Sequence, residues 1–565
     1  MSKAKEAVLI LVLIALSAIP RFAGLGAFTS IDEPFWLRVS GNFYYALGQH
    51  QFQNTLYEYH PAVTTMWLIA AGLLAYFPAY RALGQGYLRP GKFDEFMLAQ
   101  GKSLLQLLVV SRAIQVIVII GLLLALYWLL RRLFGIRTAF LTTGLVSISP
   151  FFLGHSRLLN HEAMLALFLV ISLVALVTYL HVQKSWWILA VSAIAAALGQ
   201  LTKSSGIVLF PVIGLVILVA ALQSRDRGLG RSLLDALRTL AVWLVIMAAA
   251  YVLFWPGMWV APGKMLYEVY GNALTYMFQG ARLSVTSNVE GGSLRAASLL
   301  NGLRIYWADL LWRLTPLSWI GYLLGIVFSL PRFKQPEQRS IAHLVIYAAI
   351  LGLLPVLMFS AQRGPKPPHY ALTTFVAIDL VAGLGWSRLV DLLARRVPQF
   401  QSSWLTGGAV GAILALQLVL AIGFYPYYIT YYDPLVQVLR PGSPNPILRD
   451  TGYGVGLDRA AFYLAAKPGA QDMTVLSANG LGSFSYYFPG KTIAMNDLVL
   501  SDPLVLAALK DSQYVVVDYY NQRRHHLLAD LQGIRPERSI RIDGIDFLHI
   551  YRAADILARL QASQP

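Results

Sequence analysis

Long apolar runs separated by short polar segments make up the first three quarters of the chain. The first, over 7–20, follows a basic start, and no convincing cleavage site precedes Arg21, so we interpret it as an uncleaved transmembrane helix entering from the cytoplasm. Ten further runs of about 16–25 residues suit the ~30 Å apolar core of a bilayer. They lie at 104–130, 138–153, 162–181, 186–201, 205–222, 239–257, 313–330, 341–360, 370–386 and 404–424.

The run over 62–79 is ambiguous, because His60-Pro61 precedes it and Pro78 interrupts it. Loop charges favour an interfacial helix. If this run does not cross, the cytoplasmic segments hold sixteen Lys and Arg and the short outer loops hold four. A crossing would reverse that bias. We therefore expect a long outer loop over 24–103 that contains an interfacial helix, and a second large outer loop over 258–312.

The pattern changes near residue 425. From there to the end, strand-like stretches (473–477, 514–518, 546–551) alternate with helix-like stretches (457–466, 503–510, 522–531). This alternation predicts a small α/β domain. The expected fold is a polytopic α-helical membrane protein of about eleven transmembrane helices over 1–424, followed by an extracytoplasmic α/β domain over 425–565.

Composition supports this class. Of 565 residues, 57% are hydrophobic and 13% are charged, which excludes disorder, a coiled coil or a set of ordinary soluble domains. Cysteine is absent, so disulfides and thiol catalysis are excluded. The net charge of +17 does not indicate nucleic acid, because the last segment is neutral and half of the remaining basic residues lie in predicted cytoplasmic loops.

The first outer loop carries two candidate groups. Asp32-Glu33 follows the first helix, and adjacent carboxylates at a membrane surface suit a general base for an acceptor hydroxyl. Solvated loop acids are the simpler alternative. His60 opens the interfacial segment, where a cation and helix N–H groups can hold phosphate.

Further polar residues cluster in the other outer loops. Arg157, Asn160, His161 and Glu162 lie at the start of the fourth helix, either as a polar site or as an ordinary capped loop. Lys203 opposes the charge trend, which predicts either an anionic partner or a snorkelling side chain. The segment with Arg363, Lys366, His369 and Tyr370 adds to a cationic patch at headgroup level that suits a lipid phosphate.

Other motifs are weaker. Asp379, inside a predicted helix, is either functional or a polar contact between helices. The glycines at 452, 454 and 456 predict a turn. The sequence has no Walker A motif, nucleophile elbow or strong metal-ligand spacing.

Together, the ordered motifs resemble the GT-C integral-membrane glycosyltransferases, and most closely the protein O-mannosyltransferase and aminoarabinose-transferase branch (glycosyltransferase family 39-like). The likeness spans nearly the whole chain. It rests on Asp32-Glu33, His60-Pro61, Arg131–Gly135, Ser149-Pro150 with Arg157, Leu201–Lys203, His369-Tyr370, and the join over 425–434 and 454–458. One departure is Asn160, where the family usually has Asp; Glu162 follows two residues later.

The resemblance implies an inverting transfer of a hexosyl or pentosyl unit from a polyprenyl-phosphate sugar on the extracytoplasmic face of the plasma (inner) membrane. Asp32 would be the base, with Glu33 assisting. His60, Lys203, Arg363 and Lys366 would bind the lipid phosphate. The acceptor class stays open among protein, lipid and glycan. No cofactor is implied, and a divalent metal is left open.

The main alternative is a polytopic lipid or sugar transporter, or flippase, without transferase activity. The clustering of polar residues at one face, rather than at the bilayer midplane, argues against it.

Overall fold

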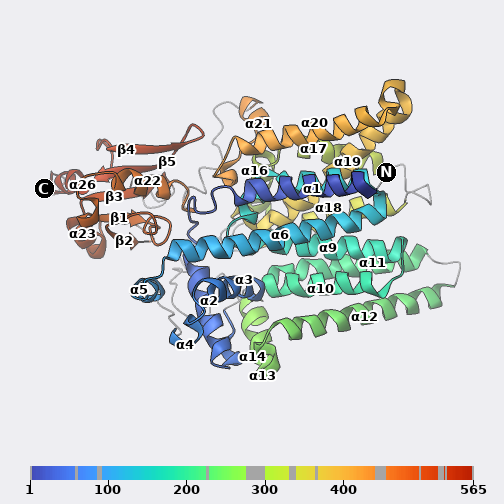
Figure 1. Ribbon diagram of the computed structural model, residues 1–565, viewed down its shortest axis with the longest axis horizontal. Coiled ribbons are helices and arrows are strands. Elements are labelled where there is room, and N and C mark those ends of the chain that lie inside the picture. Colours follow the sequence, from blue (N-terminus) through green and yellow to red (C-terminus); the bar gives the residue numbers. More distant parts are fainter. Residues whose placement is uncertain are drawn as a thin grey trace.

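In the computed structural model, a bundle of long helices carries a small β-sheet domain at one end (Figure 1). The N-terminus lies at the opposite end of the bundle from that domain. The structure describes residues 3–57, 61–84, 92–223, 228–274, 299–329, 339–362, 367–439, 453–495, 498–519, 527 and 531–562.

All eleven segments expected to cross the membrane are helical. The bundle consists of α1 (Lys3–Phe22), α6 (Leu104–Phe134), α7 (Ile136–Ile148) with α8 (Pro150–Ser156), α9 (Glu162–His181), α10 (Trp186–Thr202), η2 (Ser204–Val208) with α11 (Leu209–Gln223), α12 (Leu229–Phe254), α16 (Leu299–Arg313) with α17 (Pro316–Ser329), α18 (Arg339–Ala361), α19 (Leu372–Arg396) and α20 (Ser403–Ile422).

Fewer of these helices meet the requirements of a membrane span. Within the described residues, six are long and apolar enough to cross a bilayer. The number rises to eight if α7–α8, bent by 68°, and α16–α17, bent by 111°, each count as one span. The chain is thus an integral membrane protein by helix length and composition, while the expected number of eleven crossings is not confirmed.

Helix α9 forms the centre of the bundle. Its sequence is apolar on all sides, which is typical of a helix surrounded by others. Of its membrane-spanning window, 89% is buried, compared with 17% for α12 at the edge. Helix α12 is also largely apolar, so its exposed side chains suit contact with lipid tails rather than water.

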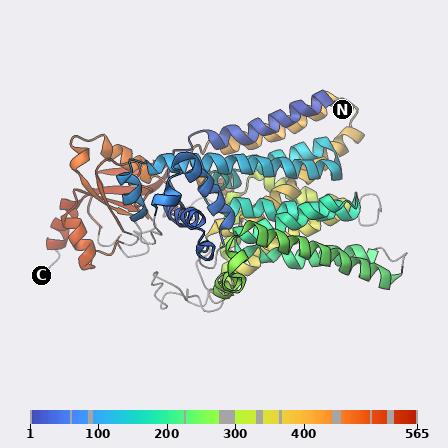
Figure 2. The same cartoon turned by 60° about the horizontal axis from the view of Figure 1, so that its bottom comes forward.

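Short helices gather at the end of the bundle that carries the sheet domain (Figures 1 and 2). The first outer loop forms α2 (Glu33–Gly48), η1 (Phe52–Asn54), α3 (Val63–Tyr76), α4 (Tyr80–Leu83) and α5 (Lys92–Ala99). The second forms α13 (Gly257–Val260), α14 (Pro262–Leu266) and η4 (Tyr267–Gly271). Helix α3, the ambiguous apolar run, has 14 residues and is too short to span a bilayer alone.

The C-terminal domain contains a five-stranded sheet in the order β2-β1-β3-β5-β4. Strands β1, β2 and β3 are parallel, and β5 is antiparallel to both β3 and β4. The strands are β1 (Thr474–Ala478), β2 (Lys491–Met495), β3 (Tyr514–Asp518), β4 (Arg538–Ile542) and β5 (Ile545–Arg552).

The other short helices lie in both parts of the chain. Those of the bundle part are η7 (Pro368–Ala371), before α19, and η8 (Pro398–Gln401), before α20. Those after α20 are η9 (Tyr428–Thr430), α21 (Pro434–Leu439), α22 (Leu457–Ala465), η11 (Ala470–Asp472), α23 (Pro503–Lys510) and α26 (Ala553–Ala562).

Alternating side chains of the central strands fill two cores. Val515 and Val517 pack with α23 and α26 on one face of the sheet, and Val516 packs with α22 on the other. The three predicted strands and the helices over 457–466 and 503–510 are confirmed. The helix expected over 522–531 lies almost wholly outside the described residues. Strands β2 and β4 were missed because they are the two sheet edges, where few positions are fully buried.

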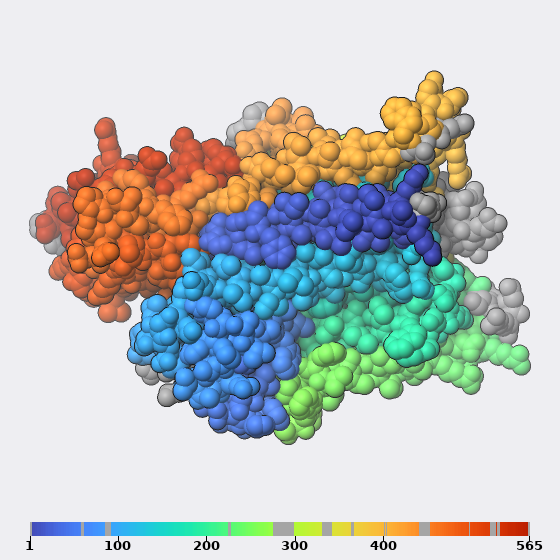
Figure 3. All heavy atoms as spheres, viewed as in Figure 1, coloured from blue at the N-terminus to red at the C-terminus, as the bar shows by residue number. Residues whose placement is uncertain are grey.

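The C-terminal domain and the adjoining end of the bundle meet along a continuous surface (Figure 3). Tyr427, in the segment that joins α20 to the sheet domain, donates a hydrogen bond of 2.8 Å to Asp458 in α22. Thr29 and Tyr487 are joined by a hydrogen bond of 2.8 Å between their hydroxyls. The first outer loop, which carries the predicted acidic pair, therefore lies between the bundle and this domain.

Candidate functional site

Glu33 and Asp32 have different surroundings, although they are neighbours in sequence. Helix α2 begins at Glu33, and the side chain of this residue is fully buried. Its carboxylate accepts from Arg112 Nε at 2.7 Å and Nη2 at 2.5 Å, and from the backbone N–H groups of Ser30 and Leu159, both at 2.8 Å. Four donors occupy the lone pairs of the two oxygens. Glu33 is thus an anchor that joins the loop to α6.

Arg112 completes this anchor. It lies within the apolar helix α6 and is fully buried. Its remaining N–H groups donate to the carbonyl oxygens of Leu25, Ala27 and Phe28 in the loop between α1 and α2. Sequence reasoning missed Arg112, although a lone arginine inside a long apolar run is a signal for a buried polar partner.

Arg157 holds the same loop from a second side. Its guanidinium donates to the carbonyl oxygens of Ala23 at 2.6 Å and Gly24 at 2.5 Å. Arg21, at the end of α1, donates to Ser156 and to the Ser147 carbonyl, both at 2.8 Å. These contacts assign Arg157 a part in fixing the backbone that precedes Asp32.

Asp32 itself is half-buried. It lies close enough to Glu162 and to Tyr453 to act on both electrostatically, and the Tyr453 hydroxyl is buried with no hydrogen-bond partner among the described residues. Of the acidic residues predicted for the site, Glu33 is paired with Arg112 and Glu162 with a lysine.

Lys203 is the lysine that pairs with Glu162. The ion pair is buried, and Lys203 Nζ lies 3.8 Å from the ring centroid of Tyr370. The predicted anionic partner of Lys203 is therefore present within the protein, which excludes a snorkelling side chain. His161 packs edge-on against Trp36 of α2, with ring centroids 4.4 Å apart.

A cluster of aromatic and imidazole rings lies beside Asp32. The rings of His155 and His369 are 5.4 Å apart, and the Tyr453 ring is 6.1 Å from the first and 5.3 Å from the second. The Asn160 amide nitrogen lies 2.8 Å from His155 Nδ1. Asn160, the departure from the family pattern, is thus bonded to a histidine.

Burial raises the pKa of Tyr453 well above its ordinary value, and the negative charge of Asp32 adds to this shift. The phenol therefore stays protonated near neutral pH and can donate a hydrogen bond. Tyr453 precedes the predicted glycine turn, which is confirmed: Gly454 and Gly456 have φ of +91° and +86°.

Most of the predicted site residues that the structure describes lie in one region. Around Asp32, the structure brings together Asn160, His161, Glu162, Lys203, His369 and Tyr370. His60, Arg363 and Lys366 lie outside the described residues. Asp379 is buried in α19 and accepts a hydrogen bond from Ser318 of α17, which supports its alternative role as a contact between helices.

Arg313 and Asp309, on the same face of α16, were also missed. Both are buried, with 3.8 Å between Arg313 Nε and Asp309 Oδ1. Arg313 acts electrostatically on His155 and His369, so it contributes positive charge to the cluster. Two opposite charges spaced i, i+4 in an apolar segment were the available signal.

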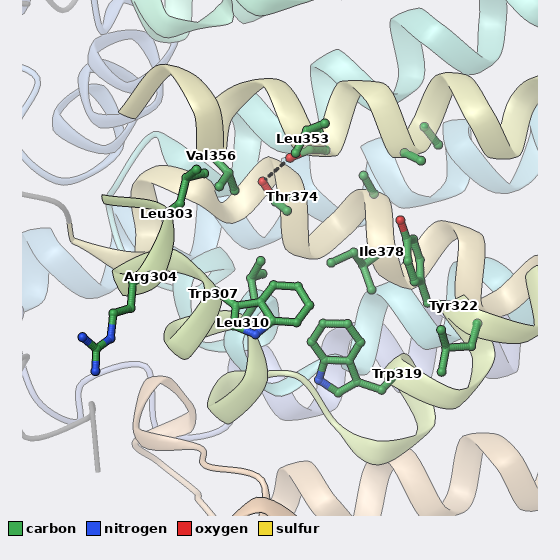
Figure 4. Close-up of a pocket in the computed structure, with 15 residues that line it drawn as sticks. Leu303, Arg304, Trp307, Leu310, Trp319, Tyr322, Leu353, Val356, Thr374 and Ile378 are labelled. Carbon is green, nitrogen blue, oxygen red and sulfur yellow. Dashed lines mark hydrogen bonds between the residues drawn. The ribbon is translucent and has the colours of Figure 1, made fainter. Parts of the chain in front are cut away.

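An apolar cavity of about 560 Å³ opens between α16, α17, α18 and α19 (Figure 4). Trp307, Leu310, Trp319 and Ile378 line it, and Arg304 lies at one end. The rings of Phe359 and Tyr370, 5.1 Å apart, lie near the end of α18 and the start of α19, and Lys203 Nζ lies 5.8 and 3.8 Å from their centroids.

Among the described residues, no group of three or more histidine and acidic side chains is arranged to hold a metal ion.

Several solved structures are similar to this chain, and three are described here in turn. ArnT from Cupriavidus metallidurans, bound to undecaprenyl phosphate, is 14% identical, with 98% of each chain covered and a TM-score of 0.46. An oligosaccharyltransferase from Archaeoglobus fulgidus is 15% identical over 92% of this chain and 70% of its own, with a TM-score of 0.43. AglB from the same organism, in complex with an inhibitory peptide and a dolichol-phosphate, is 14% identical over 91% and 69%, with a TM-score of 0.43.

No curated protein matches the chain. Residues 96–255 match the family described as dolichyl-phosphate-mannose-protein mannosyltransferase. The matched segment holds α6 to α12, including Arg112, Asn160, Glu162 and Lys203. Residues 96–255 thus carry the sequence pattern of this glycosyltransferase family, and the resemblance predicted from the ordered motifs is confirmed over that segment.

Proposed function

We propose that this protein is a membrane glycosyltransferase that moves a sugar from a polyprenyl-phosphate donor to an acceptor hydroxyl on the extracytoplasmic face, with inversion at the anomeric carbon. The family match over 96–255 supports the reaction class. The observation that carries the assignment of the base is the place of the half-buried Asp32, directly before the anchored Glu33 and close to Glu162 and Tyr453.

In the proposed reaction, the Asp32 carboxylate takes the proton of the acceptor hydroxyl as that oxygen attacks the anomeric carbon. The bond between this carbon and the phosphate oxygen breaks, and polyprenyl phosphate leaves with the bonding electrons. Because one displacement occurs, the configuration inverts. Positive charge near the leaving phosphate stabilises the transition state most when it is already fixed in a site that excludes water.

Lys203 is the cation that the described residues offer for this role. It is buried and held between Glu162 and the face of Tyr370, so its position is fixed before a donor binds. His60, Arg363 and Lys366 stay predictions for the same phosphate. Arg313 adds positive potential on the side of His155 and His369.

The apolar cavity supports a lipid-linked donor. A cavity between candidate membrane helices, lined almost wholly by apolar side chains, suits a hydrocarbon chain and does not suit a charged nucleotide. We propose that the isoprenoid chain occupies it, with Phe359 and Tyr370 between the chain and Lys203. The C-terminal domain, proposed to comprise 425–565, and the adjoining end of the bundle over 1–424 then face the extracytoplasmic compartment.

The proposal is tested by incubating the purified protein in nanodiscs with a panel of radiolabelled polyprenyl-phosphate sugars and hydroxyl acceptors. Transfer of label to an acceptor, with release of polyprenyl phosphate and an inverted product linkage determined by NMR, supports it. Movement of an intact lipid-linked sugar between leaflets in vesicles, with no transfer to any acceptor, identifies a transporter instead.

A further inference from the structure

The apolar cavity between α16, α17, α18 and α19 has the form of a groove. Helices α17 and α18 each pack closely against α19 but contact each other little, so α19 forms the floor and the other two form the walls. Ala377 and Ile378 line this floor. The hydroxyl of Thr374, the polar residue beside them, already donates to the carbonyl oxygen of Gly352 at 2.6 Å (Figure 4). The floor of the groove therefore suits a hydrocarbon.

The groove opens at the surface of the bundle. Leu323 of α17 and Leu353 of α18 line it from opposite walls, although their side chains are 60% and 52% exposed, and Trp307 of α16 is 59% exposed. Both walls belong to segments long and apolar enough to cross a bilayer, α17 as part of a bent pair with α16. The surface at this opening therefore faces lipid tails rather than water, and a lipid chain can enter the groove sideways.

Arg304 of α16 marks one end of the groove. In Figure 4 it lies at the same end as Leu303 and Val356, with its guanidinium pointing away from the apolar lining, and Tyr322 lies toward the opposite end. Arg304 is exposed and makes no hydrogen bond or ion pair with the other residues that the structure describes. A cation at the end of an apolar groove is complementary to a lipid with an anionic headgroup.

This end of the groove lies near Lys203. Gly302, two residues before Arg304, packs on the end of α18, where a Cβ added to it would lie 2.5 Å from the carbonyl oxygen of Ser360. The ring of Phe359, the residue before Ser360, has its centroid 5.8 Å from Lys203 Nζ. Arg304 and Lys203 thus lie near the same end of α18.

We propose that this groove is a lateral entry site for a polyprenyl-phosphate lipid. The chain enters from the bilayer between α17 and α18, and Arg304 binds the phosphate before it reaches Lys203. Arg304 suits this first contact because it is exposed, whereas Lys203 is buried and paired with Glu162. The inference rests on the proposed function only for the identity of this lipid as the sugar donor.

The test measures binding, separately from sugar transfer. The full-length protein in nanodiscs of neutral lipid is titrated with a radiolabelled polyprenyl phosphate and with the uncharged polyprenol of the same chain length. Arg304→Gln removes the cation, and Lys264→Gln is the control, because Lys264 of α14 is exposed but does not line the groove. Ala349→Trp fills the groove, and Leu353→Trp does so from its exposed rim. Melting temperatures show which variants fold.

We expect the unaltered protein to bind the phosphate more tightly than the alcohol. Arg304→Gln should reduce this preference about tenfold at unchanged affinity for the alcohol, because one charge-assisted contact is lost. Lys264→Gln should keep the preference, and a folded groove-filling variant should bind both lipids more weakly.

Two results would overturn the inference. One is a full preference for the phosphate in Arg304→Gln, and the other is unchanged affinity for both lipids in a folded groove-filling variant. Sugar transfer by the unaltered protein together with either result contradicts the inference alone. The expected binding pattern without transfer to any acceptor contradicts the proposed function and supports the lipid site.

Discussion

Glu33 receives two hydrogen bonds from Arg112, at 2.7 and 2.5 Å, and both side chains are fully buried. This pair divides the acidic motif into two functions. Glu33 fixes the loop against α6, and the neighbouring Asp32 is held at a defined place beside the ring cluster. The adjacent acids predicted as a catalytic pair are thus one anchor and one proposed base.

Glu33→Gln should destabilise the protein rather than act on chemistry alone. Breaking a buried ion pair by removing one charge costs about 3–5 kcal/mol, because the partner stays buried without compensation. We expect a lower melting temperature, measured in nanodiscs or detergent. Glu95→Gln is the control, since Glu95 pairs with Lys92 at an exposed position and should change stability by about 0.5 kcal/mol or less. An unchanged melting temperature with complete loss of transfer would instead indicate a chemical role for Glu33.

Lys203 should contribute to stability through Glu162 and to donor affinity through its own charge. Lys203→Met leaves Glu162 buried without a partner, so both stability and affinity should fall. Adding Glu162→Gln removes the uncompensated charge and should recover stability but not affinity, with KM for the donor raised roughly tenfold or more. Recovery of both quantities in the double variant would show that Lys203 does not bind the phosphate.

Gly482→Ala should weaken the docking of the C-terminal domain on the first outer loop. Gly482 has φ of +76°, and a Cβ there would lie 2.1 Å from Pro34 Cγ. Gly469 has φ of +71° with open space around it, so Gly469→Ala carries only the backbone cost of about 1–2 kcal/mol. Gly482→Ala should increase protease cleavage between the domain and the bundle beyond that control. Equal cleavage of the two variants would contradict the close packing.

The Asp94 carboxyl should make the free energy of unfolding depend on pH. Burial raises its pKa to about 7 despite the opposing charge of Arg38. An acid whose folded pKa exceeds its unfolded pKa stabilises the folded state at low pH, and this stabilisation declines as the pH rises from about 4 to about 7. Asp94→Asn should therefore be more stable than the unaltered protein at pH 8, with a smaller difference at pH 5. The same difference at both values would contradict this assignment.

The membrane helices and the α/β pattern could be predicted because apolar length and alternation are local signals. The number of crossings could not, since the 111° bend between α16 and α17 and the short α10 depend on packing. At the site, Lys203, Asn160 and His369 were found because they are polar residues in loops predicted to be outer. Tyr453 and Arg112 were missed because both lie far from the acidic pair in sequence. Only in the folded chain does Tyr453 lie near Asp32 and does Arg112 bind Glu33.

Asp32→Asn tests the central claim most directly. The substitution keeps the size of the side chain and removes its basicity, so the bound donor should remain while proton removal stops. Asp546→Asn, which alters an exposed ion pair with Arg541, is the matched control. Single-turnover transfer from a bound polyprenyl-phosphate sugar should be lost in Asp32→Asn at unchanged donor affinity and should persist in the control. Full transfer by Asp32→Asn would contradict the assignment of Asp32 as the base.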